Sequence, residues 1–310
     1  MSNKRALVLS GGSIKGAFQV GAFKALIESG YRPDSIYGIS VGSLNALFIA
    51  QEAGKQNVSV ENIDWKSIVE NLIYFWINNI RQPNDIIKLK KSTQIAFEAL
   101  TNNFKGLIDT SPLHNLIRRT ISMEYIYKCP IKLEIGVVNI ADGEIIYANP
   151  NYPNFIDYVL ASCAIPIVMP IVNIGNSPDK AFLDGSMRNV APLKRAYDKG
   201  AEEIVCIACQ AENLCGVTFN YGNLMYLADR VLDILLNENV NMDIERILTI
   251  NSLLSDNNDV SKRKKKAKIT IIRPPVPINI DMFKFTYEDI NNLIQTGYHI
   301  GKEIIMKNSE

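Results

Sequence analysis

The sequence predicts an α/β fold of three layers, in which a mostly parallel central sheet lies between two layers of helices. Strand and helix signals alternate from the first residues, and this order requires parallel strands joined by helical crossovers. Two glycine-rich turns, at 10–16 and 38–42, each separate a short apolar run from a helical pattern. The 310 residues, of which 47% are hydrophobic, are enough to bury a large core.

Two strand–helix pairs account for the beginning of the chain. In each predicted helix, apolar side chains recur at the spacing of one helical face. Gly30 follows the first helix, in the position where a glycine in the left-handed conformation commonly ends a helix. We expect the second helix to end at Gly54. The pairs are a strand at 6–9 with a helix at 16–29, and a strand at 35–39 with a helix at 44–53.

Helices dominate residues 57–128, and strands alternate with helices after that. Thr110-Ser111-Pro112 has the form of a helix start with proline at the first helical position. Ala141-Asp142-Gly143 predicts a hairpin. The later elements are strands at 131–140, 144–148, 204–208 and 269–272, and helices at 155–162, 223–253 and from a Thr286–Asp289 cap to about Met306.

We expect one domain over residues 1–310, because the sequence contains no internal repeat and no low-complexity linker. The motifs described below fall within about 5–210. Within this domain, residues 57–128 are expected to form a helical, cap-like insertion. Residues 211–310 are expected to form a mainly helical C-terminal extension.

Charge and composition exclude several classes of partner. The 33 Lys and Arg residues nearly balance 32 Asp and Glu residues, so no global field attracts nucleic acid or an anionic membrane. The apolar run at the N-terminus is too short for a signal peptide, and no run approaches the roughly 20 residues of a membrane-spanning helix. Five cysteines, an odd number, argue against a secreted disulfide framework. We expect a cytoplasmic protein, with peripheral contact to membranes.

The sharpest local signal is Gly38-Ile39-Ser40-Val41-Gly42. Glycines two residues either side of a serine permit a tight strand-to-helix turn, which lifts the hydroxyl above the sheet at the positive end of the helix. This geometry suits a nucleophile. The alternative is that Ser40 only caps the helix.

A second glycine-rich loop, at 10–16, directly follows the first strand. Its small residues allow backbone N–H groups to converge at a helix start, where negative charge is favoured. Neither nucleotide-binding glycine pattern fits the loop, so an oxyanion hole or a plain turn remains. Lys15 either contacts a headgroup phosphate or pairs with a carboxylate.

A serine nucleophile needs a base, and the two histidines are poorly placed to supply one. His299 lies inside the last predicted helix, and His114 lies in the first turn of another. Asp184 is a candidate without histidine, because an apolar strand delivers it to the turn that Gly185 makes possible. Asp-Gly is also a common turn dipeptide with no catalytic role.

The two loops and the Asp-Gly turn, taken as an ordered set, resemble the patatin-like phospholipases. The resemblance extends to residues 16–21, to the Ala-Ser-x-Ala-x-Pro segment at 161–166 and to the stretch 184–192. It covers about residues 5–210 and implies a three-layer patatin-like fold. Ser186 departs from the family pattern, and so does Ser13, which stands where glycine is usual.

The resemblance implies a lipid acyl hydrolase that needs no cofactor and no metal, acting on a phospholipid or lysophospholipid. It assigns Ser40 as the nucleophile and Asp184 as the base of a catalytic dyad, with an acyl-enzyme intermediate. It assigns the backbone N–H groups of Gly11, Gly12 and Ser13 to the oxyanion hole.

Three alternatives remain open. The same dyad serves an acyltransferase if an alcohol replaces water as the acceptor. A lipid-binding relative without turnover is the second alternative, for which Ser13 and Ser186 are the hints. A histidine-triad hydrolase that uses His299 is the third. Oligomeric state is not predicted.

Three other features have a functional and a structural interpretation. Ile68, Leu72, Phe75 and Trp76 form a stripe that lines an acyl groove, touches a membrane or belongs to the core. The basic run at 262–266 either attracts anionic headgroups or is a solvated loop. Cys206, Cys209 and Cys215 are interpreted as buried thiols and not as a metal site.

Overall fold

The computed structural model describes residues 4–175, 179–216, 222–256 and 266–308, and an eight-stranded sheet forms its middle layer. The strand order is β10-β9-β1-β2-β5-β8-β7, and β6 pairs with β5 outside this path. The strands are β1 (Arg5–Leu9), β2 (Ser35–Ile39), β5 (Lys132–Asn139), β6 (Ile145–Ala148), β7 (Val172–Asn173), β8 (Ala181–Asp184), β9 (Glu203–Ile207) and β10 (Lys268–Ile272).

The sheet is parallel from β10 to β5, and its antiparallel strands gather around β5. The pairs β10–β9, β9–β1, β1–β2 and β2–β5 are parallel. The pairs β5–β6, β5–β8 and β7–β8 are antiparallel. This confirms the mostly parallel sheet and the hairpin between β5 and β6 that the sequence predicts.

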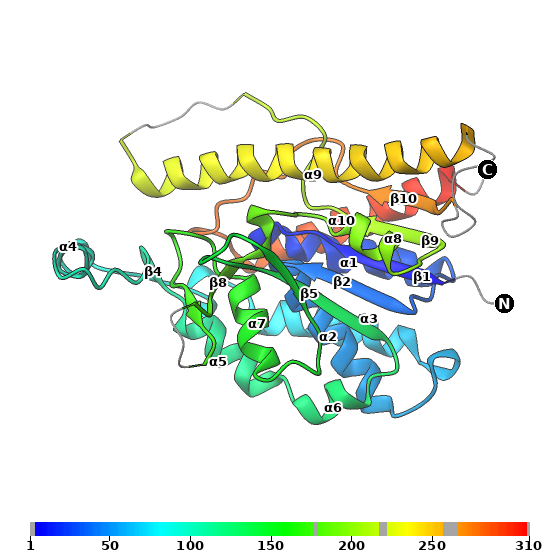
Figure 1. Cartoon of the computed structure of the whole chain (residues 1–310), viewed down its shortest axis with the longest axis horizontal. Helices are drawn as coiled ribbons and strands as arrows, with labels where there is room; N and C mark the ends of the chain where they lie inside the picture. The colour runs from blue at the N-terminus through cyan, green and yellow to red at the C-terminus, as the bar shows by residue number, and fades with distance from the viewer. Residues whose placement is uncertain (1–3, 176–178, 217–221, 257–265, 309–310) are drawn as a thin grey trace.

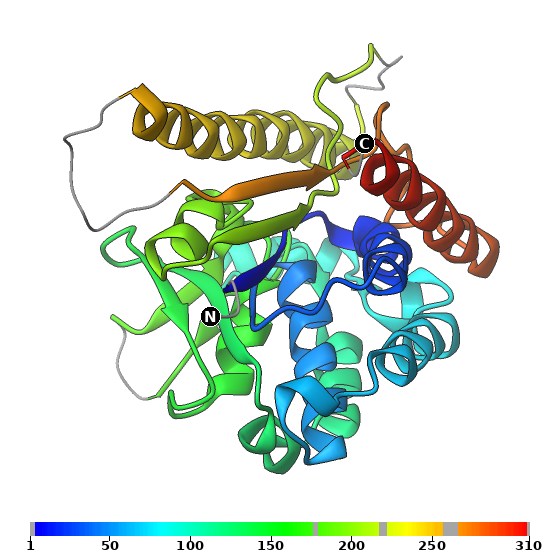
Figure 2. The ribbon, with the colours of Figure 1, turned by 90° about the vertical axis from the view of Figure 1, so that its right-hand side faces the viewer.

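Helices cover both faces of the sheet (Figures 1 and 2). Along β1, Leu7 and Leu9 enter one hydrophobic core, whereas Ala6 and Val8 enter another on the opposite face. The predicted three-layer fold is therefore confirmed. The first core is covered by α1 (Gly16–Glu28), α2 (Val41–Gln56), α3 (Trp65–Asn79), α7 (Phe155–Ser162) and α10 (Tyr287–Lys307), and the second by α8 (Leu193–Asp198) and α9 (Leu224–Asp256).

The last helix of the chain packs directly on the first. A Cβ atom at Gly21 of α1 would lie 1.8 Å from the carbonyl oxygen of Ile294 of α10. A Cβ atom at Gly297 would lie 2.0 Å from the carbonyl oxygen of Phe18. The two backbones approach closely only because neither position carries a side chain.

The segment 57–128 is mainly helical, as predicted, but it also contains an unexpected two-stranded sheet. Besides α3 it forms α4 (Ser92–Leu100), α5 (Ser111–Thr120) and α6 (Met123–Lys128). The antiparallel strands β3 (Lys88–Leu89) and β4 (Ile108–Asp109) flank α4.

Most predicted elements lie where the sequence places them, and β2 and α7 match residue for residue. The prediction for α2 was wrong at its C-terminal end. The helix continues past Gly54 and ends before Asn57, which adopts the left-handed conformation at φ 51°. Gly54 instead permits close contact with α6, because the carbonyl oxygen of Tyr125 would lie 1.8 Å from a Cβ atom at position 54. The short elements β7 and α8 were not predicted.

Within the described ranges, no helix combines the length and the apolar character that crossing a bilayer requires. Most of the basic run, residues 262–265, lies outside the described residues. Cys206 and Cys209 are buried as predicted, and burial raises the pKa of both thiols. Cys215 is exposed, so the prediction that it is buried was wrong.

Candidate active site

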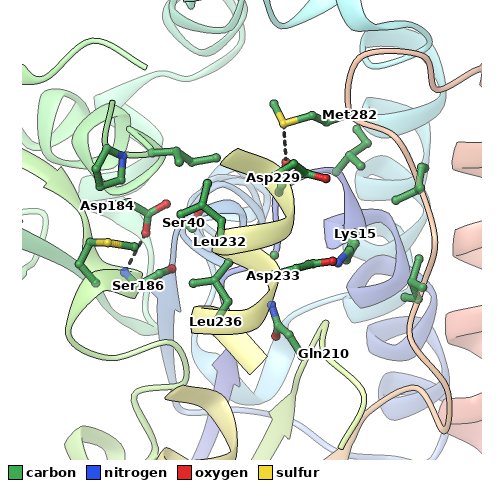
Figure 3. Close-up of a pocket in the computed structure, with 18 of the residues that line it drawn as sticks. Lys15, Ser40, Asp184, Ser186, Gln210, Asp229, Leu232, Asp233, Leu236 and Met282 are labelled. Atoms are coloured by element: carbon green, nitrogen blue, oxygen red, sulfur yellow. Dashed lines mark hydrogen bonds and ion pairs between the residues drawn. The ribbon is translucent and has the colours of Figure 1, made fainter. Parts of the chain in front are cut away.

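The pairing of strands along β5 brings Ser40 and Asp184 to the same place. β6 occupies one edge of β5, so β2 and β8 lie end to end along the other edge. Ile39, the last residue of β2, lies opposite Gly136, and Asp184, the last residue of β8, lies opposite Val137. Two side chains 144 positions apart in the sequence therefore emerge beside one another (Figure 3).

Ser40 sits on a strained turn between β2 and α2. Its backbone angles are φ 53° and ψ −127°, a conformation that residues other than glycine rarely adopt. The flanking glycines allow the turn to close. A Cβ atom at Gly38 would lie 2.6 Å from the carbonyl oxygen of Gly42, and one at Gly42 would lie 2.2 Å from that of Leu9. Strain of this kind is typical of functional sites.

Ser162, the last residue of α7, holds this turn in place from inside the protein. Its hydroxyl is fully buried; it accepts the backbone N–H of Ser40 at 2.9 Å and donates to the carbonyl oxygen of Gly136 at 2.7 Å. Because that donation uses the only Ser162 proton, the Ser43 hydroxyl must be the donor in their 2.8 Å contact. Ser162 belongs to the segment 161–166 that resembles the family, but the sequence pattern alone indicates no role for its hydroxyl.

The Asp184 carboxyl is buried and fixed by backbone contacts. Its own N–H donates to the carbonyl oxygen of Ala164 at 3.0 Å, and the N–H of Ser186 donates to its Oδ1 atom at 2.8 Å. Burial raises the pKa of Asp184 to about 6, an effect partly offset by hydrogen bonding with the Ser40 side chain. At neutral pH the group is therefore mainly a carboxylate.

The Ser186 hydroxyl does not capture the Asp184 carboxylate. The Ser186 side chain lies close enough to Asp184 to lower its pKa. However, the Ser186 Oγ atom is buried and has no hydrogen-bond partner among the described residues. It packs instead against Gly11, where a Cβ atom would lie 2.3 Å from it.

The glycine-rich loop leaves two backbone donors free, not the three that the resemblance implies. The N–H of Gly11 donates to the carbonyl oxygen of Val190 at 3.0 Å. The N–H groups of Gly12 and Ser13 have no acceptor within the part of the chain that the structure describes. Ser13 adopts φ 51°, so serine takes here the left-handed conformation that favours glycine.

Two cavities of different character meet at Ser40. In the first, Asp184 and Ser186 lie on one side and charged residues lie on the other (Figure 3). The second is almost wholly apolar and is lined by residues that include Val41, Leu44, Trp76, Ile80, Met169 and Met282. An ester placed at Ser40 would thus have an apolar channel on one side and a polar one on the other.

The charged side of the first cavity centres on an ion pair. Lys15 donates to Asp233 of α9 at 2.7 Å, which agrees with the second of the two roles considered for it, pairing with a carboxylate. Burial, together with the charge of Asp233, raises the pKa of nearby Asp229 to about 6. Gln210 also lines this cavity, and its buried Oε1 atom has no partner among the described residues. No sequence motif points to Gln210, Asp229 or Asp233.

Neither histidine lines the two cavities that contain Ser40. His299 is exposed on α10, with its ring against that of Tyr298. His114 hydrogen-bonds to Thr110 at 3.3 Å, and burial lowers its pKa. The structure therefore favours a base without histidine.

The apolar stripe of α3 divides between core and cavity. Trp76 lines the apolar cavity, and its indole N–H donates to the side-chain oxygen of Asn45 at 2.8 Å. Ile68, Leu72 and Phe75 are buried in the core. With Trp76 also buried, this part of the stripe is unavailable for membrane contact.

Comparison with known proteins shows that this chain is similar in sequence to lipases and phospholipases. Residues 7–197 match the family model of the patatin-like phospholipases. Triacylglycerol lipase 5 of Saccharomyces cerevisiae is 30% identical over 235 residues, which are 67% of this chain and 30% of that protein. Patatin-like phospholipase domain-containing protein 7 of Rattus norvegicus is 32% identical over 227 residues, 72% of this chain and 15% of that protein. This chain thus spans less than a third of either relative.

Two solved structures align with nearly the whole chain at low similarity. VipD from Legionella pneumophila aligns with a TM-score of 0.45 and 14% identity, over 99% of this chain and 67% of that one. The ExoU–SpcU complex of Pseudomonas aeruginosa aligns with a TM-score of 0.35 and 14% identity, over 98% of this chain and 52% of that one.

Proposed function

This chain belongs to the patatin-like phospholipase family, and we propose that it hydrolyses carboxylic esters of lipids with a dyad of Ser40 and Asp184. The observation that carries the proposal is the register along β5, which sets the ends of β2 and β8 side by side. The strained turn at Ser40 and the buried Asp184 carboxylate support it.

The proposed reaction proceeds through an acyl-enzyme. Asp184 takes the proton of the Ser40 hydroxyl while Oγ attacks the acyl carbon. The N–H groups of Gly12 and Ser13 stabilise the oxyanion. When the intermediate collapses, the alcohol leaves with the proton from Asp184. Water then gives a proton to Asp184 and attacks the acyl-enzyme, and the second collapse returns that proton to Ser40 and releases the fatty acid.

We propose a phospholipid or lysophospholipid as the substrate. The apolar cavity beside Ser40 suits an acyl chain, since it is lined by side chains such as Val41 and Leu44. The polar cavity suits the alcohol part of the ester. There the buried, unpartnered Gln210 Oε1 and Ser186 Oγ atoms offer acceptors to a glycerol hydroxyl.

We further propose that the protein acts in the cytoplasm, at the surface of membranes. All five cysteines lie in the described residues and are free, which agrees with a reducing compartment.

An activity panel with active-site labelling tests the proposed function. The substrates are phosphatidylcholine, lysophosphatidylcholine, triolein and p-nitrophenyl butyrate, and a fluorophosphonate probe reports the nucleophile. We expect Ser40→Ala to abolish labelling, and Ser40→Ala and Asp184→Asn each to lower kcat/KM by about a thousandfold or more.

His299→Ala is the matched control, and it should retain wild-type activity. Loss of activity in this variant, with turnover retained in Asp184→Asn, would favour the histidine triad. Product analysis with added glycerol separates hydrolysis from acyl transfer. Fluorophosphonate labelling of wild type at a residue other than Ser40 would overturn the proposed nucleophile.

A further inference from the structure

An arm formed by residues 88–106 projects away from the three layers. It runs from β3 through α4 to the start of β4, and α4 lies at the far left of Figure 1. None of the nine residues of α4 is buried. An isolated helix of this length is marginal in water, so something other than core packing must hold it.

A polar centre holds the arm together. The Lys90 ammonium group donates to both carboxylate oxygens of Glu98, at 3.0 and 2.8 Å, and to the carbonyl oxygens of Lys105 and Gly106. The backbone N–H of Lys105 also donates to Glu98, at 3.1 Å. The side chains of Lys90 and Glu98 are only 7% and 13% exposed, so this ion pair forms the interior of the arm.

Large apolar side chains cover the outside of the arm. This arrangement inverts the usual one, in which apolar groups are inside and charges are outside. Apolar groups gathered on the surface mark an interaction site. The four side chains and their exposed fractions are Leu89 65%, Phe97 68%, Leu100 85% and Phe104 44%.

The charge of the arm identifies the partner chemistry. Residues 88–106 contain four lysines and one glutamate, a net charge of +3, although the whole protein carries only +1. Lys90 is paired, whereas Lys88, Lys91 and Lys105 are exposed. Exposed apolar side chains interspersed with lysines are typical of elements that lie in the interface of an anionic bilayer.

The base of the arm joins a segment that lines both cavities at Ser40. The N–H groups of Leu107 and Ile108 donate to the carbonyl oxygen of Val168 at 2.9 and 3.0 Å. On either side of Val168, Ile165 and Met169 line the cavities. Ile167 between them is 70% exposed and adopts φ 66°, a strained conformation for a β-branched residue.

We infer that the arm anchors this protein to anionic lipid surfaces, with the apolar side chains of α4 in the acyl region and the lysines at the headgroups. Its attachment to segment 165–169 would bring the Ser40 cavities close to the bilayer. The inference rests on the proposed function for the identity of the substrate, but its test measures binding alone.

Vesicle flotation with Ser40→Ala protein tests the anchor without any turnover. The vesicles contain either phosphatidylcholine alone or equal parts of phosphatidylcholine and phosphatidylglycerol. Phe97→Asp with Leu100→Asp should lower binding to the mixed vesicles by about tenfold or more, since each buried apolar side chain contributes about 1.5–3 kcal/mol. Lys88→Glu with Lys91→Glu should reduce the preference of the protein for vesicles that contain phosphatidylglycerol. The same variant should also make vesicle binding less sensitive to salt.

The matched control replaces two exposed apolar side chains elsewhere, Tyr127→Asp with Met306→Asp. Each of these side chains is 64% exposed, and they lie on α6 and α10, away from the arm. The control should bind like the parent protein. Equal binding by the Phe97→Asp, Leu100→Asp variant and the control would overturn the membrane anchor. The exposed apolar side chains of the arm would then point to a protein partner. Arm-dependent binding without any esterase activity in the wild type would overturn the proposed function and keep the anchor.

Discussion

Ser40 and Asp184 have different structural requirements, and the fold satisfies each of them in a different way. Ser40 must project from the sheet, so its backbone is forced to φ 53° and ψ −127° between two glycines. Asp184 must stay ionised although it is buried, and the backbone N–H of Ser186 supplies a partner for its charge. The surrounding structure stabilises both the strained backbone of Ser40 and the buried charge of Asp184.

The Asp184 carboxyl determines the expected pH dependence of activity. Burial raises its pKa to about 6, and only the carboxylate can accept the Ser40 proton. The rate of acylation by p-nitrophenyl butyrate should therefore be level above this pKa and fall about tenfold per pH unit below it. Stopped-flow measurement of the acylation step gives the profile. A rate that is independent of pH between about 4 and 8 would exclude Asp184 as the base.

The same carboxyl predicts a pH-dependent difference in stability. Because its pKa is raised in the folded state, its contribution to stability is complete below about pH 4 and is lost as pH rises through about 6. Asp184→Asn carries no charge to desolvate, so it should be more stable than wild type by about 3 kcal/mol at pH 8 and equally stable near pH 4. Thermal unfolding at both pH values measures this, and a difference that does not change with pH would contradict the shift.

The turn between β2 and α2 depends on an element far from it in the sequence. Ser162 at the end of α7 accepts the N–H of Ser40 and donates to Gly136 of β5, so one hydroxyl ties three elements together. The acceptor of the Ser40 N–H therefore comes from α7 and not from β2 or α2, the two elements that the turn joins.

Ser162→Ala should weaken both the turn and the activity. It leaves the buried N–H of Ser40 without an acceptor, at a cost of about 1–3 kcal/mol in unfolding free energy. We expect kcat to fall about tenfold or more as Ser40 shifts. Ser43→Ala is the matched control, because it also removes a fully buried hydroxyl but leaves the contact from Ser162 to Ser40 intact. If the two variants lose equal activity, Ser162 has no special role in positioning the turn.

The C-terminal third of the chain completes both the sheet and the candidate site. β10 adds to the edge at β9, α10 packs on α1, and α9 supplies the Asp233 partner of Lys15. Asp243 of α9 also accepts the N–H groups of Val190 and Ala191, in the loop that receives the Gly11 N–H. We therefore propose that the described residues form one folding unit.

Two spectroscopic probes test whether the described residues unfold as one unit. Both tryptophans, Trp65 and Trp76, are buried in α3, whereas the longest helices are the 33-residue α9 and the 21-residue α10. Unfolding followed by tryptophan fluorescence and by helical circular dichroism should give the same midpoint. Loss of helical signal before the tryptophan change would show that the C-terminal part is a separate unit.

The class of fold and the two loops of the site can be predicted from the amino-acid sequence alone. Alternation of strand and helix patterns follows from local hydrophobic periodicity, and the glycines around Ser40 and at Gly11 and Gly12 mark turns that side chains would block. Both are properties of short segments, so they can be read without knowing what lies across the sheet.

The surroundings of those loops depend on how the chain folds and could not be predicted from local patterns. The meeting of Ser40 with Asp184 follows from two strands sharing one edge of β5, and no local pattern encodes which edge a strand takes. Three further contacts also join residues 122 or more positions apart: the Gly11 N–H with Val190, Ser162 with Ser40, and Lys15 with Asp233. Such contacts form when distant segments pack together, and packing depends on shape and burial across the whole chain.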